Sequence, residues 1–532
     1  MSARLQPPSG SPALKATKPR TSTQAAQAAH AGKPARTRWL ALAVLCVTVL
    51  IANLDNTVLN VALPTLVRDL NATSTDLQWI TDAYIIVFAG LLLAAGSLAD
   101  RVGRKKTFLA GLAIFAAGSA AAAFSGGVAT LIAARAGMGV GGALMIPSTL
   151  SIVTNMFADP AERQRAIALW GGTSGLGVAL GPIIGGLLLA RFWWGSVFLI
   201  NVPIAVIGLV AAWWLVPDSK NADAHAPDLL GTLLSISGIG LLLWSVIEAP
   251  SRGWSSALVI AAGAAGLVTL ALFALWERHT THPMLNLSYF RNRSFSAAIT
   301  AVSAVTFGLY GALFVLTQFM QFFLGYTPLQ AGVRVLPAAA AVVIVAPPSA
   351  RLVRAIGTKL TMTAGLALIA AGLWQISTAT MATTYAGTVL GMVLLGAGAG
   401  LAIPTATGSV IGSAPESDSG VASATNTTAL QLGGALGVAV VGSLLDTRYQ
   451  DNLALVHLPH AVAATVNSSL GGALAVAARA GGAAGQQLAG LARGAFISGM
   501  DLGLLTAAVV ALAGAVAALA WLPRRSGRGK AL

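Results

Sequence analysis

An acidic side chain lies inside an apolar stretch near the start of the chain. The segment LDNTVLNVALP, residues 54–64, places Asp55 beside Asn56 and near Asn60, within an apolar run that begins at Trp39. A carboxyl group in such a setting can pair with a cation that keeps it ionised. It can also bind and release a proton, because scarcity of water favours the neutral form. The residue types therefore predict ion pairing or proton transfer, with the two asparagines as candidate substrate contacts.

With Asp55, the clearest charges within apolar runs are Asp82, Arg135 and Asp501. Counting about 1.5 Å per residue along each predicted helix places Asp55, Asp82 and Arg135 in one layer of the outer half of a membrane. Ionisable groups at such depth are functional candidates by default, so we interpret these three as proton-coupling residues. The alternative is a structural ion pair or a side chain that reaches the membrane surface. For Asp501 we favour a structural role.

The composition explains why these charges are unusual. Hydrophobic residues make up 56% of the 532 residues and charged residues only 9%, whereas soluble domains carry about 25% charged residues. The chain is therefore expected to be an all-α integral membrane protein. Its one cysteine, Cys46, excludes an internal disulfide bond.

The apolar runs have the length of membrane spans. A spanning helix needs roughly 20 residues, and by this measure the sequence predicts about fourteen transmembrane helices. Their approximate positions are 39–63, 77–98, 107–126, 130–156, 165–190, 194–216, 229–249, 255–276, 295–323, 329–350, 359–377, 385–411, 419–445 and 496–522.

The distribution of basic residues predicts the orientation. With both termini in the cytoplasm, 24 of the 32 Lys and Arg residues lie on the cytoplasmic side, as the positive-inside rule requires. The same distribution accounts for the net charge of +15 without a nucleic-acid partner. We expect a multi-pass protein of the plasma membrane, with a disordered basic tail at 1–37 and a second cytoplasmic tail at 524–532.

An internal repeat predicts two parallel halves. IPS at 146–148 matches IPT at 403–405, GVALG at 177–181 matches GGALG at 433–437, and LADRVGRK at 98–105 weakly matches LVRAIGTK at 352–359. The offsets agree within three residues, an arrangement found in one large class of secondary transporters. It predicts six-helix bundles at 38–217 and 281–523, an inserted transmembrane hairpin at 218–280, and a long extracellular loop at 448–494. The repeat maps the three coupling residues onto Gly311, Ala338 and Gly391, so proton chemistry is expected only in the N-terminal half.

Four motifs resemble those of the major facilitator superfamily, specifically its fourteen-helix drug:proton antiporter branch. They are LDNTVLNVALP at 54–64, GSLADRVGRKK at 96–106, RAGMG at 135–139 and GVALGPIIGG at 177–186. The resemblance implies the major facilitator fold. It implies a cytoplasmic gating loop formed by Gly96, Asp100, Arg101, Gly103 and Arg104. It also implies a role in proton transfer for Arg135, although Met138 stands where this motif usually has glutamine.

The last motif implies antiport, through Gly177, Gly181, Pro182, Gly185 and Gly186. Glycines spaced by four residues give one smooth helix face on which another helix can approach closely, and Pro182 can kink the helix. Simple helix packing is the alternative interpretation.

A substrate pocket is predicted on the apolar run at 295–323. Phe307, Tyr310, Phe314, Gln318 and Gln321 recur there at helical spacing. The repeat register places this helix opposite the first one, so Tyr310, Phe314 and Gln318 should line a central pocket with Asn56 and Asn60. Ordinary packing or contact with lipid is the alternative.

The sequence contains no enzymatic motif in the structural context that its chemistry requires. GMGVGG at 137–142 matches the dinucleotide pattern but has no strand before it, and GxxxxGK[ST], GxSxG and HExxH are absent. We therefore expect no enzyme, no ATP site, no cofactor and no metal site.

The sequence predicts a monomeric, proton-coupled antiporter that exports lipophilic or cationic drugs by alternating access. The alternatives are an exporter dedicated to one endogenous metabolite or self-made antibiotic, a proton-coupled importer, and a sensor without transport.

Overall fold

The computed structural model describes residues 35–157, 159–220, 227–281, 283–413, 419–454 and 460–522. Every regular element in these ranges is a helix. The predicted tails at 1–37 and 524–532 lie outside the described residues, except for residues 35–37.

The first group of helices follows the apolar runs of the N-terminal part closely. Thr73 caps the second of them through a capping box with Asp76, which satisfies free backbone N–H groups at that helix start. The elements are α2 (Ala35–Leu70), α3 (Ser74–Val102), α4 (Arg104–Ala123), α5 (Val128–Met156), α6 (Pro160–Arg191), α7 (Ser196–Leu199) and α8 (Asn201–Leu215).

A hairpin and a second group of helices follow. The hairpin consists of α9 (Leu229–Arg252) and α10 (Ala257–His279). The later elements are the 3₁₀ segment η1 (Leu287–Arg291), α11 (Arg293–Gln318), the π-helical η2 (Phe319–Phe323), α12 (Pro328–Arg334), α13 (Leu336–Ser377), α14 (Tyr385–Gly412), α15 (Ser419–Ala454), α16 (His460–Ser468), α17 (Leu470–Ala480) and α18 (Gly482–Trp521).

Many of the helices are long enough to span a membrane. Among the described residues, twelve helical segments are long and apolar enough to cross a membrane. One of these segments, Pro328–Ser377, contains a break at Gly357, where φ is 87°. In addition, α6 contains a shorter apolar stretch, Leu180–Arg191. The prediction of an all-α integral membrane protein is confirmed.

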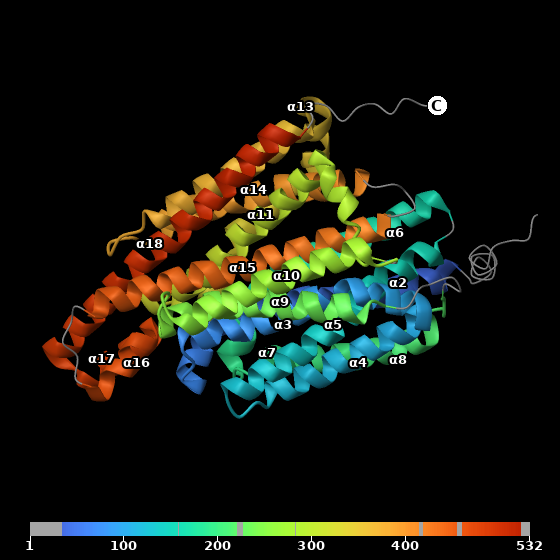
Figure 1. Ribbon diagram of the computed structural model, residues 1–532. Helices are drawn as coiled ribbons and strands as arrows, with labels where there is room; N and C mark the ends of the chain where they lie inside the picture. The colour runs from blue at the N-terminus through green and yellow to red at the C-terminus, as the bar shows by residue number, and fades with distance from the viewer. Residues whose placement is uncertain are drawn as a thin grey trace, which may run out of the picture.

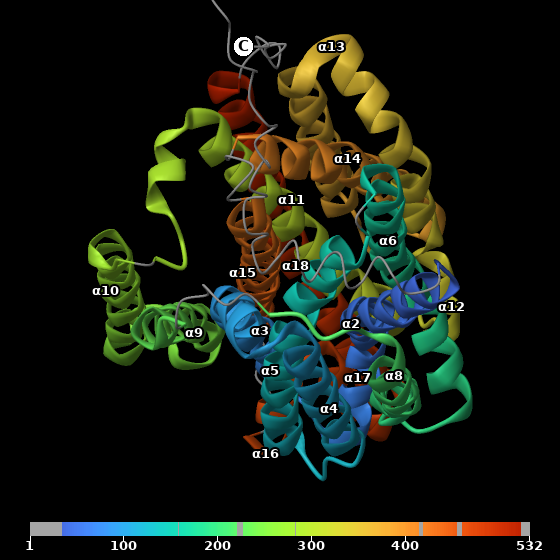
Figure 2. The same cartoon turned by 90° about the vertical axis from the view of Figure 1, so that its right-hand side faces the viewer.

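The two groups pack in the same way. In the first group α2 lies on α6, and α4 lies on α5 and α8; in the second group α11 lies on α15, and α13 lies on α14 and α18. Gly103 and Gly357, which the weakest of the sequence matches aligns, both have positive φ, at 123° and 87°. Figure 1 shows α2, α4, α5 and α8 in its lower part and α13, α14 and α18 in its upper part. The hairpin stands to one side of both groups, with α9 nearer to α3 (Figure 2).

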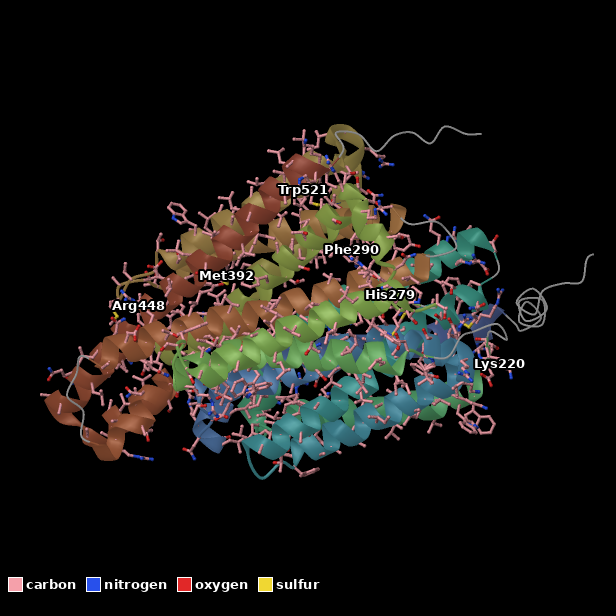
Figure 3. The ribbon with its side chains drawn as sticks, in the orientation of Figure 1. Lys220, His279, Phe290, Met392, Arg448 and Trp521 are labelled. Atoms are coloured by element: carbon pink, nitrogen blue, oxygen red, sulfur yellow. The ribbon has the colours of Figure 1, made fainter. Side chains whose placement is uncertain are left out.

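Contacts at one end join the two bundles. The Gln321 side chain donates a hydrogen bond to the Val61 carbonyl at 2.9 Å, and the Arg68 guanidinium lies 5.4 Å from the centre of the Phe322 ring. This end also holds α16 and α17 (Figure 1). Figure 3 shows Arg448 toward this end and Lys220 at the opposite one. We refer to them as the Arg448 end and the Lys220 end.

Candidate functional site

A buried ion pair joins α2 to α5. The Arg135 guanidinium donates to the Asp55 carboxylate at 2.5 Å, and the two side chains are 0% and 1% exposed. Asp55 therefore has a cation within contact distance in a dry setting, where attraction between opposite charges is strong. The structure brings together two of the three residues that the sequence singled out for proton coupling.

Arg135 is held by three further contacts. Its Nε donates to the Ile80 carbonyl at 3.0 Å, and its charge lies 4.7 Å from the centre of the Tyr84 ring and 6.0 Å from that of Phe198. An arginine over an aromatic face gains a cation–π attraction that grows as water is removed. The guanidinium is therefore held by contacts other than its pairing with Asp55.

Asn201, the first residue of α8, forms a hydrogen bond with Asp55. The Asn201 amide donates to the other Asp55 oxygen at 2.9 Å and lies 3.4 Å from the Ser119 hydroxyl. Our sequence interpretation missed Asn201, although it stands as the one polar residue of the apolar segment FLINVP at 198–203. The Asp55 carboxylate thus has two charged or polar partners, one for each oxygen.

The glycine motif of α6 positions the helix that carries Asp55. A Cβ atom added at Gly177 would lie 2.9 Å from Asn53, and one at Gly185 would lie 3.0 Å from Val58. Gly181 faces Thr57, whose hydroxyl also lies 3.3 Å from the Gly177 carbonyl. Only glycine leaves room for this approach, so the predicted smooth face is used against α2.

The remaining part of this motif faces the other bundle. A Cβ atom at Gly186 would lie 2.6 Å from the Cα of Leu329 in α12. The Pro182 carbonyl in turn faces Gly332 of the same short helix. The motif therefore packs on one side against α2 and on the other against the second bundle.

Asp82 lies apart from the Asp55–Arg135 pair. It is fully buried on α3, and neither carboxylate oxygen has a hydrogen-bond partner among the described residues. It shares a helix face with Gln78, four residues earlier. An isolated charge in such a place is costly, whereas a neutral carboxyl group is tolerated.

A polar contact between α3 and α15 was not predicted. The Gln78 amide donates to Asp446 at 3.1 Å, and the Ser443 hydroxyl lies 3.2 Å from the Gln78 carbonyl oxygen and 2.8 Å from the Val246 carbonyl. Asp446 is 4% exposed. It was missed because the predicted span ended at 445, whereas α15 continues to Ala454. A buried acidic residue is therefore also present in the second bundle, while the expectation that proton chemistry belongs to the N-terminal half stays a prediction.

The predicted gating loop forms a tight turn at the Lys220 end. Asp100 accepts a hydrogen bond from Arg104 at 2.8 Å, across the Gly103 turn. The Arg104 backbone N–H donates to the Ser219 carbonyl at 2.9 Å, beyond the end of α8. Arg101 is exposed, and Gly96 has open space on its Cβ side.

Only some of the predicted pocket residues lie near the ion pair. Tyr84, which supports Arg135, is within hydrogen-bonding reach of Asn56, and Tyr310 packs on Gly434 of α15. The remaining members are buried: Asn60 donates to the Asn56 carbonyl at 3.1 Å, Gln318 donates to the Phe314 carbonyl at 3.2 Å, and the Phe314 ring is 1% exposed. Their assignment to substrate stays a prediction.

Comparisons with known proteins show the family of the chain. Residues 45–438 match the model of the Major Facilitator Superfamily. The chain is 38% identical to the multidrug efflux pump LfrA of Mycolicibacterium smegmatis, over 91% of this chain and 97% of that protein. It is 35% identical to the tetracenomycin C resistance and export protein of Streptomyces glaucescens, over 90% of this chain and 91% of that protein.

Two further similarities extend the comparison. The methyl viologen resistance protein SmvA of Salmonella typhimurium is 33% identical over 88% of this chain and 95% of its own length. Among solved structures, a bacterial homologue of the human lysosomal transporter Spinster superposes with a TM-score of 0.66 at 17% identity, covering 93% of this chain and 100% of that one. With the family match over most of the described helices, these findings show that the chain is a multi-pass membrane transporter of the Major Facilitator Superfamily, related to drug efflux pumps.

Proposed function

We propose that the protein is a proton-coupled antiporter that exports lipophilic and cationic drugs across the plasma membrane. The observation that carries this proposal is the buried pair of Asp55 and Arg135, placed next to the Tyr84 ring and the Asn56 amide. The pair offers a proton acceptor, a fixed counter-charge and an aromatic contact within one layer. The names of its relatives, which include a multidrug efflux pump and a methyl viologen resistance protein, support the choice of substrate class.

The proposed topology has fourteen spans with both termini in the cytoplasm. Two observations support the count: the break at Gly357 divides one long segment into two spans, and α6 is 32 residues long with an apolar C-terminal part. We place the Lys220 end in the cytoplasm, as the positive-inside rule requires. The bundles are then 38–217 and 281–523, with the hairpin at 218–280 between them.

On this topology the contacts between Gln321 and Val61 close the outer side. On the same topology, the state described is closed at the outer side, with Asp55 paired to Arg135. Val61 lies on the same helix as Asp55, six residues further along. A change in the ion pair between Asp55 and Arg135 therefore acts on α2, the helix whose Val61 carbonyl forms the outer contact with Gln321.

Charge competition can couple the proton to a cationic substrate. When Asp55 is ionised it neutralises Arg135, whereas its protonated form leaves one net positive charge in the site. Two positive charges about 10 Å apart repel each other by roughly 1.7 kcal/mol at an effective dielectric constant of about 20. Protonation of Asp55 would then weaken the binding of a cationic substrate by roughly tenfold or more, and a bound cation would weaken proton binding by the same factor. Inward proton movement adds about 2.3 kcal/mol per 100 mV of membrane potential.

A second candidate is the export of one self-made or endogenous compound. The 35% identity to a tetracenomycin C resistance and export protein favours it. The fold and coupling would be the same, and only the range of substrates would differ. Growth of an expressing strain in the presence of several unrelated cations separates the two, because a dedicated exporter protects against one of them at most.

The proposed function is tested by reconstitution. Proteoliposomes with an acidic lumen are given external methyl viologen, which carries a permanent charge and is not trapped by pH alone. An antiporter accumulates it as protons leave, while a symporter does not. Asp55→Asn should abolish this accumulation, and Asp501→Asn, which changes a partly exposed acid of α18, should not. Normal accumulation by Asp55→Asn would refute the proposed coupling.

A further inference from the structure

A cavity of about 290 Å³ lies between the hairpin and the two bundles. Its walls come from α3, α9, α10, α11 and α15, and the segment after α10 contributes Leu285 and Phe290. The volume is at the lower end of the range for small-molecule sites. α10 itself packs mainly on α9 and only lightly on η1, and Figure 2 shows it apart from α11 and α15, which contribute the opposite walls of the cavity.

The walls of the cavity carry no charged side chain. Their polar members are Ser235, Ser303, Thr425 and Thr428. Ser303 and Thr425 donate to backbone carbonyls at 3.2 and 2.8 Å. The Thr428 hydroxyl is buried and has no partner among the described residues. The cavity is therefore mostly apolar, and the Thr428 hydroxyl offers it a donor, which suits a hydrocarbon chain with an ester group near one end. It does not suit a cationic drug, since nothing in the walls balances its charge.

Basic residues follow Phe290, one of the wall residues of the cavity, in the chain. Phe290 lines the cavity and is 37% exposed, and Figure 3 shows it toward the same end of the molecule as His279. Arg291 follows it directly, and Arg293 begins α11. Both arginines are exposed, and neither forms a salt bridge within the described part of the chain. Basic residues beside a gap between transmembrane helices are typical of anionic lipid sites.

We propose that this cavity binds one acyl chain of an anionic phospholipid, with the phosphate at Arg291 and Arg293. The chain fills the space between α10 and the bundles, and the Thr428 hydroxyl donates to a carbonyl of the lipid. Because the walls belong to the hairpin and to both bundles, the lipid connects three parts of the molecule. This site is separate from the Asp55–Arg135 pair and does not depend on proton coupling.

The test uses the full-length protein in nanodiscs that contain phosphatidylglycerol with a photoreactive diazirine on one acyl chain. Labelled peptides are mapped by mass spectrometry. We expect label on the segment of α15 from Thr428 to Leu436, which forms one wall. Ser235→Phe fills the cavity and should lower this labelling about fivefold. Ser237→Phe, an exposed position two residues further along α9, should leave it unchanged.

The head group is tested with matched charge changes. Wild-type protein should label about threefold more strongly with phosphatidylglycerol than with phosphatidylcholine. The double change Arg291→Gln and Arg293→Gln should remove this preference, whereas Arg351→Gln and Arg354→Gln, at two exposed positions of α13, should preserve it. Equal labelling in Ser235→Phe and Ser237→Phe, or displacement of the lipid by methyl viologen, would overturn the assignment.

Discussion

The Asp55 carboxylate and the Arg135 guanidinium meet at 2.5 Å although 80 residues separate them in the chain. Asn201 binds the other carboxylate oxygen, and the Ile80 carbonyl binds the guanidinium. The pair therefore connects α2, α3, α5 and α8 at one point. Any change in its charge acts on four helices of the same bundle.

The stability of the two single variants should differ from that of the double variant. Asp55→Asn leaves Arg135 buried without its anion, and Arg135→Gln leaves the acid without its cation; each change should cost about 3–5 kcal/mol. Because both changes remove the same pair, the double variant should lose less stability than the sum of the losses in the two single variants. Thermal unfolding in detergent measures this, and strict additivity would contradict the pair's role. Proton-driven exchange should be lost in all three.

Asp82 should respond differently, because its carboxylate has no hydrogen-bond partner to lose among the described residues. Asp82→Asn keeps the shape of a protonated carboxyl group, so the unfolding temperature should stay the same or rise. Proton-driven export should fall at least tenfold, while exchange of labelled for unlabelled substrate without a gradient should continue. Asp501→Asn is the matched control and should retain both activities. Loss of exchange together with export in Asp82→Asn would indicate a structural role instead.

The fold could be predicted from the sequence to a large extent, since apolar runs of spanning length directly reflect the cost of exposing polar backbone groups to lipid. The turn at Gly103 and the break at Gly357 were aligned by a weak match, and both glycines have the positive φ that other residues avoid. The site was predicted less completely. Asn201 and Gln78 act through contacts with distant helices, which a single sequence does not reveal.

Asp446 illustrates the limit at a helix end. Hydropathy detects where apolar residues stop, and α15 continues past that point as DTRYQDNLA, residues 446–454. α15 packs against α3 and α18, and Asp446 and Tyr449 are enclosed by protein there, whereas Arg448 and Asp451 are exposed. The end of a helix that is set by tertiary packing can be predicted only when the partner helix is known.

The close approach of α6 to α2 predicts a sharp difference between two glycines. Gly181→Leu places a large side chain against Thr57, while Gly172, on the same helix, has open space at its Cβ. Overpacking of this kind costs about 1–3 kcal/mol and would displace the helix that carries Asp55. We expect Gly181→Leu to lower both the unfolding temperature and the rate of export. Gly172→Leu should change neither; equal effects of the two would mean that the approach is not required.

The contact between Gln78 and Ser443 should have to break in every transport cycle. It joins α3 of the first bundle to α15 of the second, beside the buried Asp446, at the end proposed to face outward. In a Cys46→Ser background, Gln78→Cys and Ser443→Cys can be bridged by a short bis-methanethiosulfonate reagent, which forms one reducible disulfide bond with each cysteine. The bridge should stop export, and reduction should restore it, because alternating access requires the bundles to separate here.

A bridge within one bundle provides the comparison. Thr407 and Asn426 lie on α14 and α15, and the Asn426 amide donates to the Thr407 hydroxyl at 3.2 Å. Since both belong to the second bundle, which should move as one body, bridging Thr407→Cys to Asn426→Cys should leave export largely intact. Export at the unbridged rate by the Gln78–Ser443 pair would show that the outer contact stays closed throughout the cycle. The rocking of the two halves would then have to occur about some other contact.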